Sequence, residues 1–369
     1  MNRIDNSTDW LEFIENLIEK EAIRLIDEKS NEEEATRAIE RGVDEVLKIA
    51  PGIYVEAMKK NAQSMLRKER RMRRAFEKRS FKRWRPAFDL LETIWRAAEE
   101  STAAFNNKHR HDAAEKNDQV FDALTRLNGR GLQVASEAIH LLRGGYADGA
   151  MSRWRTLHEI LVTAMFIRNH GPDVAERYFA SVDFSRLKAA NQINRFADRA
   201  NLQPFSSEEL LQFEKRCEAW EERFGEKLND HDWARPGFPG LVSKARITFA
   251  HLEENTGMDH WRPRYKWASQ HTHAGHRDHG VGLGLTETDS DIILVGASNS
   301  GFVDPMQMIS LHVCSLATIL LLTRPSIDTL TITRALYELA HEVGETAIER
   351  EAETLRKHRR HFWSWRRRS

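Results

Sequence analysis

The stretch Gly-Gly-Tyr-Ala-Asp-Gly-Ala-Met-Ser-Arg-Trp-Arg-Thr-Leu-His-Glu-Ile-Leu-Val-Thr-Ala-Met-Phe-Ile-Arg-Asn-His, residues 144–170, decides the fold. It begins as a turn and continues as a helix, because its apolar residues recur near the 3.6-residue helical period. These apolar positions are Ala150, Leu157, Leu161, Ala164, Met165 and Ile167. Arg155, His158 and Glu159 lie three and four positions apart, so they form one polar patch beside the apolar stripe. Charge beside a core is costly unless it is paired or used, which makes this patch the first candidate site.

Length and composition are those of a large helical protein. The chain has 369 residues, of which 40% are hydrophobic and 30% are charged, as expected for many amphipathic helices. Its net charge is zero, so no overall electrostatic field selects a partner. The charges are nevertheless segregated. Residues 1–50 hold 14 acidic and 7 basic side chains, whereas residues 59–85 hold 2 acidic and 13 basic ones.

Cysteine content and hydropathy indicate a cytoplasmic protein. Cys217 and Cys314 are the only cysteines, so neither a disulfide framework nor a zinc knuckle is expected. The first residues are polar and acidic, unlike a signal peptide. The apolar run Met306–Thr323 is short and contains His312, which favours a buried core helix over a membrane span. No stable membrane insertion is therefore expected.

Helical periodicity extends outward from the central stretch in both directions, with proline and glycine pairs at the expected breaks. The expected helices cover residues 8–28, 31–49, 55–85, 87–109, 111–142, 144–170, 173–200, 206–224, 241–254, 262–274, 305–323 and 326–356. The β-branched and apolar run 292–295, bracketed by turn residues, predicts a strand pair. The predicted fold class is all-α, a multi-helix bundle with one short β-hairpin insertion near residues 283–297. Three regions are expected, residues 1–86, 87–325 and 326–369.

The basic stretch 65–85 is the second candidate site. Its aromatic residues lie between basic ones, and in a nucleic-acid complex basic side chains contact phosphates while aromatic rings stack on bases. The alternative is a solvated linker helix that pairs with the acidic segment upstream. The residues expected to bind nucleic acid are Arg70, Arg71, Arg73, Arg74, Lys82, Arg83 and Trp84.

The histidine-rich stretch 265–279 is the third candidate. Ser269 and His273 lie four apart on the expected helix, so they can contact each other, but a serine hydrolase would still lack its orienting acid. Three histidines (His271, His273 and His276) could bind a metal, although no accompanying Glu-x-x-His spacing exists. Histidine with a nearby arginine suits phosphodiester chemistry better. The alternative interpretation is a polar cluster that only caps the end of the helix. No metal or other cofactor is predicted, and no P-loop motif occurs.

Two motifs carry a resemblance to a known family. The Arg-x-Leu-x-Glu helix at Arg155–Glu159 and the later Tyr265, Ser269 and His273 at four-residue spacing resemble an uncharacterised bacterial family of helical domains of unknown function. The resemblance covers roughly residues 115–325. That family implies a helical fold and transfers no activity.

The helical layout also resembles the HEPN superfamily, many of whose members are dimeric, metal-independent RNases of toxin or phage-defence systems. Their Arg-x4–6-His motif is matched by Arg153 and His158. Positions five apart on a helix point about 140° apart, so these two do not share a face. We therefore expect a HEPN-like site to consist of Arg155, His158 and His273, with Glu159 orienting Arg155.

The resemblance implies a cytoplasmic, homodimeric protein that acts on RNA in bacterial stress or phage defence. In the catalytic version, Arg155, His158, Glu159, Ser269 and His273 form a metal-independent endoribonuclease site. A histidine moves the proton of the 2′-hydroxyl nucleophile, and Arg155 stabilises the charge that develops on the phosphate. The alternative is a non-catalytic helical scaffold whose basic segments bind nucleic acid, anionic lipid or a protein partner.

Overall fold

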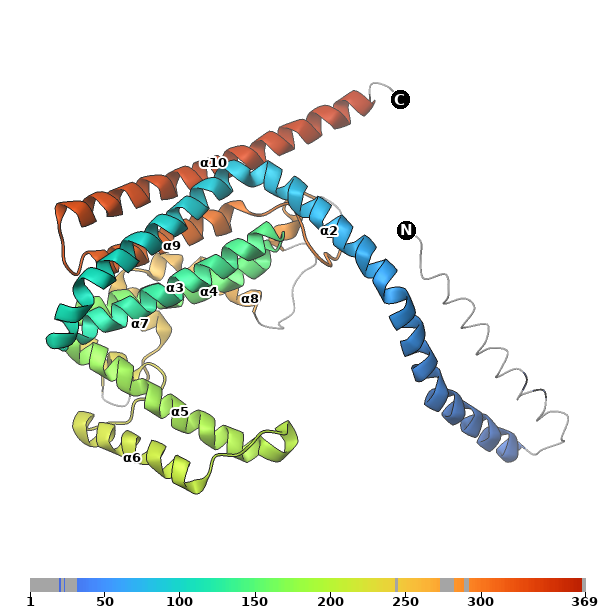
Figure 1. Cartoon of the computed structure of the whole chain (residues 1–369), viewed down its shortest axis with the longest axis horizontal. Helices are drawn as coiled ribbons and strands as arrows, with labels where there is room; N and C mark the ends of the chain where they lie inside the picture. The colour runs from blue at the N-terminus through green and yellow to red at the C-terminus, as the bar shows by residue number, and fades with distance from the viewer. Residues whose placement is uncertain are drawn as a thin grey trace. The chain divides into compact units, whose positions relative to one another are not determined.

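The computed structural model describes Lys20, Ile23 and residues 32–242, 245–272, 282–288 and 292–366, without the side chains of 32–35, 38, 39, 45 and 357–366. The chain divides into two compact units, residues 1–76 and 77–369. Figure 1 shows the described elements, which are helical. They are α2 (Glu32–Glu115), α3 (Gln119–Arg143), α4 (Ala147–His170), α5 (Pro172–Ala200), α6 (Ser207–Phe224), η1 (Asp232–Gly237), α7 (Phe249–Thr256), η2 (Asp259–Trp261), α8 (Arg262–Gln270), η3 (Leu283–Leu285), α9 (Val303–Leu321) and α10 (Ile327–Arg366).

The second unit is a multi-helix bundle organised around α4. This helix packs against α3, α7, α8 and α9, and α9 packs in turn against α10 (Figure 1). The apolar stripe expected on α4 is buried, including Leu157, Leu161 and Ile167. Helices α3 and α9 approach each other closely at Gly131, where an added Cβ would lie 2.1 Å from a methyl carbon of Leu316. The central helix predicted from the sequence is thus confirmed.

The turn before α4 is the glycine turn that the sequence predicts. The amide of Tyr146 donates to the carbonyl of Leu141, and the amide of Gly145 donates to the carbonyl of Leu142. Gly145 has φ +88°, a left-handed conformation that glycine adopts at little cost. This arrangement ends α3 and reverses the chain, so that α3 and α4 lie side by side (Figure 1).

The predicted β-hairpin is wrong. No strand occurs in the described residues between 282 and 301, and Ile292–Val295 are exposed. A run of β-branched residues makes a strand only where a partner strand accepts its backbone hydrogen bonds, and an isolated hairpin is marginal in water. Here the amide of Ser298 instead donates to the carbonyl of Gly145, and the hydroxyl of Ser298 donates to the carbonyl of Gly284.

Two of the prolines expected to separate helices do not do so. Pro51 and Pro86 both lie inside α2, which continues to Glu115. A proline in a helix interior costs about 3 kcal/mol through a lost hydrogen bond and a steric clash. Around Pro86, the fully buried side chains of Trp84 and Phe88 stabilise the helix against that cost.

The apolar run around His312 forms α9. By length and composition α9 could cross a membrane, and two thirds (67%) of its most apolar window is buried inside the protein. Its apolar surface is covered by α3, α4 and α10, as for the core helix of a globular bundle.

Candidate functional site

The polar patch on α4 divides into a buried part and a partly exposed part. His158 is completely buried, whereas the side chains of Arg155 and Glu159 are 24% and 36% exposed. The difference follows from helix geometry, because adjacent positions point about 100° apart. His158 therefore faces the bundle interior, while Arg155 and Glu159 lie at its edge.

The partly exposed part joins α4 to α8 through Tyr265. Its hydroxyl donates to Oε1 of Glu159 at 2.6 Å and accepts from Nη2 of Arg155 at 2.8 Å. Arg155 and Glu159 also form an ion pair at 2.9 Å, and the guanidinium lies over the Tyr265 ring at 4.9 Å. Burial, reinforced by the Glu159 carboxylate, raises the pKa of Tyr265 to about 12. This tyrosine therefore stays protonated at neutral pH and acts as a hydrogen-bond bridge, not as a base.

The buried part is a polar node formed by His158, Glu253, Arg262 and His312, which come from α4, α7, α8 and α9. Nε2 of His158 lies 2.9 Å from Oε1 of Glu253, and Nδ1 of His158 lies 3.0 Å from Nε2 of His312. Arg262 donates to the other oxygen of Glu253. Burial, followed by the charge of His158, holds the pKa of His312 well below 6.5.

These contacts link His312, His158 and Glu253 in a chain of hydrogen bonds, in which the donor and the acceptor are set by the tautomers of the two rings. Trp154 stacks on His158 with ring centroids 5.4 Å apart, and Trp261 meets His312 edge-on at 5.1 Å. Because His158, Glu253 and His312 are all at most 1% exposed, no substrate atom reaches them.

The described residues of the third candidate stretch have different partners. The hydroxyl of Ser269 donates to the carbonyl of Tyr265, one turn earlier in α8, so it is bound within its own helix. His271 is almost fully buried and lies 3.2 Å from Asp148 at the start of α4. His273 and His276 lie outside the described residues. Among the residues that the structure describes, no group of three metal-binding side chains gathers.

The basic stretch of α2 also separates into exposed and buried residues. Within the first unit, Arg70, Arg71, Arg73 and Arg74 are exposed and form no ion pair with a described residue. Within the second unit, Lys82 is exposed.

Arg83 and Trp84, also in the second unit, are held by neighbouring residues. Arg83 forms a bidentate pair with Glu287. Trp84 is completely buried, and its ring stacks on Phe302 at 5.1 Å. Neither face of the Trp84 ring is therefore open to a nucleobase.

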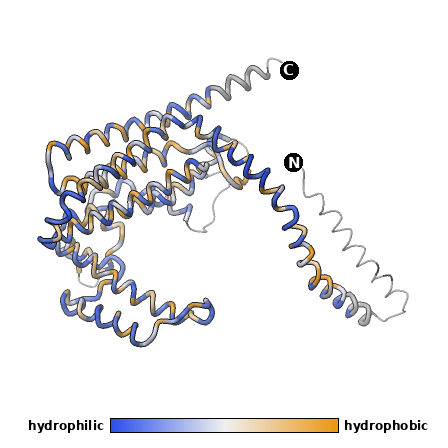
Figure 2. The backbone as a smooth tube through the Cα atoms, in the orientation of Figure 1, coloured by the Kyte–Doolittle hydropathy of each residue, from blue (hydrophilic) through white to orange (hydrophobic). Residues whose placement is uncertain are grey.

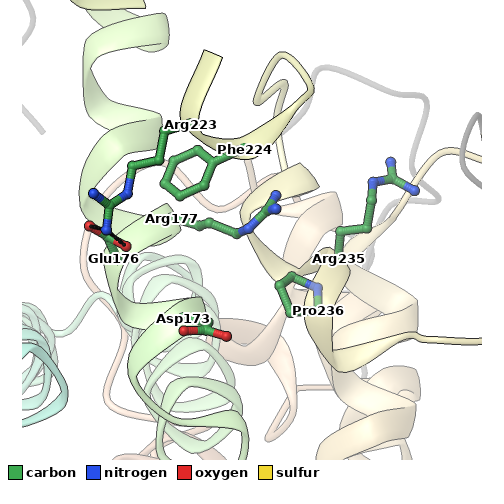
Figure 3. A pocket seen from close by; sticks show the side chains of 7 residues that line it. All are labelled: Asp173, Glu176, Arg177, Arg223, Phe224, Arg235 and Pro236. Atoms are coloured by element: carbon green, nitrogen blue, oxygen red, sulfur yellow. Dashed lines mark hydrogen bonds and ion pairs between the residues drawn. The ribbon is translucent and has the colours of Figure 1, made fainter. Parts of the chain in front are cut away.

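A cavity of about 480 Å³ lies between α5, the end of α6 and η1 (Figure 3). Three arginines line it, but each has a carboxylate partner. Arg177 pairs with Glu226, and Arg223 pairs with Glu176. Arg235 pairs with Asp232 and also approaches Glu226. The positive charge of this cavity is thus compensated within the protein, so it does not favour an anionic ligand.

Sequence reasoning missed Glu253, Arg262 and His312 as members of the node. They lie 95, 104 and 154 residues beyond His158, and no local spacing links them to it. The sequence did contain one signal, because a histidine and a glutamate inside otherwise apolar helical faces require polar partners.

The fold and this node define an all-helical domain without a recognisable catalytic constellation among its described residues. Residues 121–289 match the model of a family of unknown function (DUF5677). That segment includes Arg155, His158, Glu159, Glu253 and Tyr265, and it is an uncharacterised domain. The match does not extend to His312 or to the basic stretch of α2. The search of curated proteins and the search of solved structures gave no match.

Proposed function

We propose that the protein is a helical RNA-binding scaffold that contacts RNA phosphates through the basic face of α2 in the first unit. The observation that carries this proposal is the set of exposed arginines without an ion pair to a described residue. Arg67, Arg70, Arg71 and Arg74 lie on one side of the helix, within an arc of about 100° when 100° is counted per residue. A row of unpaired guanidinium groups on one face is suited to successive phosphates.

The geometry of α4 supports a structural role for the first motif. Arg155 is neutralised by Glu159 and bonded to Tyr265, so it offers little positive charge to a phosphate. His158 is buried against Glu253 and cannot take a proton from a substrate. In this proposal the α4 patch holds α7, α8 and α9 in place, and RNA binding depends on α2.

The test is RNA binding by fluorescence anisotropy at several salt concentrations. Arg67, Arg70, Arg71 and Arg74 are replaced together by Gln, which keeps the length and polarity of the side chains. We expect affinity for single-stranded RNA to fall at least about tenfold, and the slope of log affinity against log salt to fall by about 3, since each phosphate contact contributes about 0.7.

The control carries the same loss of four charges elsewhere. Arg96, Arg126, Arg186 and Arg216 are exposed, lie in the second unit and are paired with carboxylates. Their replacement by Gln should leave RNA affinity within about twofold, since their charge is already compensated. Equal losses in the two quadruple variants would contradict the proposal, because they would reflect net charge and not the α2 face.

A second candidate function is a HEPN-like, metal-independent endoribonuclease of a bacterial stress or defence system. One observation favours it, namely that the two motifs of the first and third candidate sites meet at Tyr265 on a partly exposed surface. Since His158 is buried, proton transfer would fall to His273. Incubation of RNA in EDTA with the wild type, Arg155→Ala and His273→Ala distinguishes the candidates. Cyclic-phosphate ends from the wild type alone would support the nuclease. No cleavage by any of the three proteins would support the RNA-binding scaffold instead.

A further inference from the structure

A stripe of exposed apolar side chains runs along α2 in the first unit. Its members are all at least 42% exposed, and Figure 2 shows hydrophobic residues among hydrophilic ones along this part of the helix. The stripe consists of Val43, Leu47, Tyr54, Met58, Met65 and Met72. Single exposed apolar residues are ordinary, but six on one face of a helix indicate a surface that binds a partner.

The members of the stripe form a seam along one face of the helix. Successive members lie 4, 7, 4, 7 and 7 positions apart, so when about 100° is counted per residue they fall within an arc of about 60°. From Val43 to Met72 the seam is about 44 Å long. Arg67, Arg70 and Arg74 lie on the opposite side of the helix, so a partner on the seam leaves the basic face free.

The charges along α2 indicate which partner fits. Residues 32–45 contain 6 acidic and 2 basic side chains, whereas residues 59–74 contain 8 basic and 1 acidic. Beside the seam, Glu40 and Asp44 lie in the acidic half, and Lys68 lies in the basic half. Two copies of this helix in antiparallel orientation place each acidic half against a basic half. A parallel pair would place like charges together.

We propose that residues 43–72 of α2 form an antiparallel helix pair with the same segment of a second copy of the chain. Such a pair is isologous, because the same patch of each copy is buried. In the register that places Tyr54 on the two-fold axis, Val43 lies near Met65 of the partner subunit. The inference does not rest on the RNA-binding proposal, since it concerns the other face of the helix.

The first experiment measures the mass of the full chain in solution over a range of concentrations, for two matched variants. Leu47 and Ile49 are 62% and 61% exposed, but they lie about 200° apart on the helix, so only Leu47 is on the seam. We expect the wild type to be a dimer. Leu47→Glu should weaken dimerisation about a hundredfold, because it places two carboxylates in the seam, whereas Ile49→Glu should leave the dimer intact.

Three results would overturn the proposal. A wild type that remains monomeric at tens of micromolar would show that the stripe has another cover, for example residues 1–31 of the same chain. A dimer that withstands Leu47→Glu would lie elsewhere on the molecule. Equal effects of Leu47→Glu and Ile49→Glu would show that the seam is not what is buried.

A second experiment tests orientation and does not depend on Leu47→Glu. Val43→Cys and Met65→Cys proteins are oxidised separately and as a mixture, with the wild type as the background because Cys217 and Cys314 are both buried. The antiparallel arrangement predicts disulfide-linked dimers in the mixture and little in either protein alone. Dimers of each protein alone would indicate a parallel pair, and no cross-linking in any sample would exclude the seam; either result overturns the proposal.

Discussion

Two polar clusters on this chain differ in what surrounds them. In the second unit, the patch on α4 meets a partner for each of its charged or titratable groups, with Glu253 facing His158 and Tyr265 bridging Arg155 and Glu159. In the first unit, Arg67, Arg70, Arg71 and Arg74 of α2 face solvent without an ion pair to a described residue.

The comparison shows that residue type alone does not indicate a binding surface. Arginine, histidine and glutamate in the α4 patch form the chemistry expected of a nuclease, yet their burial and pairing support the structural role that we propose for them. Arg67, Arg70, Arg71 and Arg74 of α2 have simpler chemistry, but their positive charge is not compensated by a described carboxylate. The following predictions test this contrast, from the largest expected effect on stability to the smallest.

Glu253→Ala should lower the free energy of unfolding by about 3–5 kcal/mol. The substitution leaves the Arg262 guanidinium without its carboxylate and leaves the buried Nε2 of His158 without an acceptor. Urea denaturation followed by circular dichroism gives the value. Glu254→Ala is the matched control, because Glu254 is the next residue of α7 and is exposed, so its removal should cost less than about 0.5 kcal/mol. Similar losses for the two variants would show that the node is not a structural lock.

Acidification should destabilise the protein through His312. Burial holds its folded-state pKa well below the value of 6.5 expected when unfolded. As the pH falls below about 6.5, the unfolded chain therefore binds a proton that the folded chain does not, and stability decreases by up to about 1.4 kcal/mol per pH unit.

The measurement is the free energy of unfolding between pH 7 and pH 5. His312→Gln should be less stable at pH 7 and should show a flatter pH dependence than the wild type. His111, which is exposed, provides the control, and His111→Gln should keep the wild-type slope. An unchanged slope in His312→Gln would mean that this histidine is not held neutral.

Tyr265→Phe should cost about 1–2 kcal/mol, since it removes the hydroxyl that donates to a carboxylate and accepts from a guanidinium. Tyr146→Phe is its control, because Tyr146 is exposed and its hydroxyl makes no hydrogen bond within the described part of the chain. Thermal unfolding of both variants gives the comparison. If Tyr265→Phe were as stable as the wild type, the bridge would have no structural role and its surface would become a stronger candidate for substrate binding.

Replacement of the four α2 arginines by Gln should change the free energy of unfolding by less than about 0.5 kcal/mol. These side chains are exposed and bond to no described carboxylate, so folding gains little from them. Urea denaturation of this variant is measured beside that of Glu253→Ala. The loss in free energy of unfolding should be the smallest for this variant and the largest for Glu253→Ala. A loss above about 2 kcal/mol would show that the basic face is paired within the protein, as the linker-helix alternative requires.

The sequence predicted the helical elements better than it predicted their interruptions. The period of Leu157, Leu161 and Ile167 was sufficient to place α4 in the core, because burial of one face determines a helix. Local sequence signals were not sufficient at Pro51 and Pro86, where α2 continues through both prolines despite their cost to a helix. They also failed at residues 292–295, where strand propensity found no partner strand.

Of the four residues of the buried node, the sequence pointed only to His158. Spacing along one helix placed Arg155, His158 and Glu159 together, as the structure has them. It gave no information on how far that face is rotated into the core, and therefore none on the burial of His158. Its partners Glu253 and His312 come from other helices, and only tertiary packing brings them together.

The most direct test is the RNA affinity of three proteins measured side by side, the wild type, the α2 quadruple variant and Arg155→Ala. The account predicts that the quadruple variant binds single-stranded RNA at least about tenfold more weakly, while Arg155→Ala binds as the wild type does. The reverse order, with a loss only in Arg155→Ala, would contradict it and would make the α4 patch the RNA site.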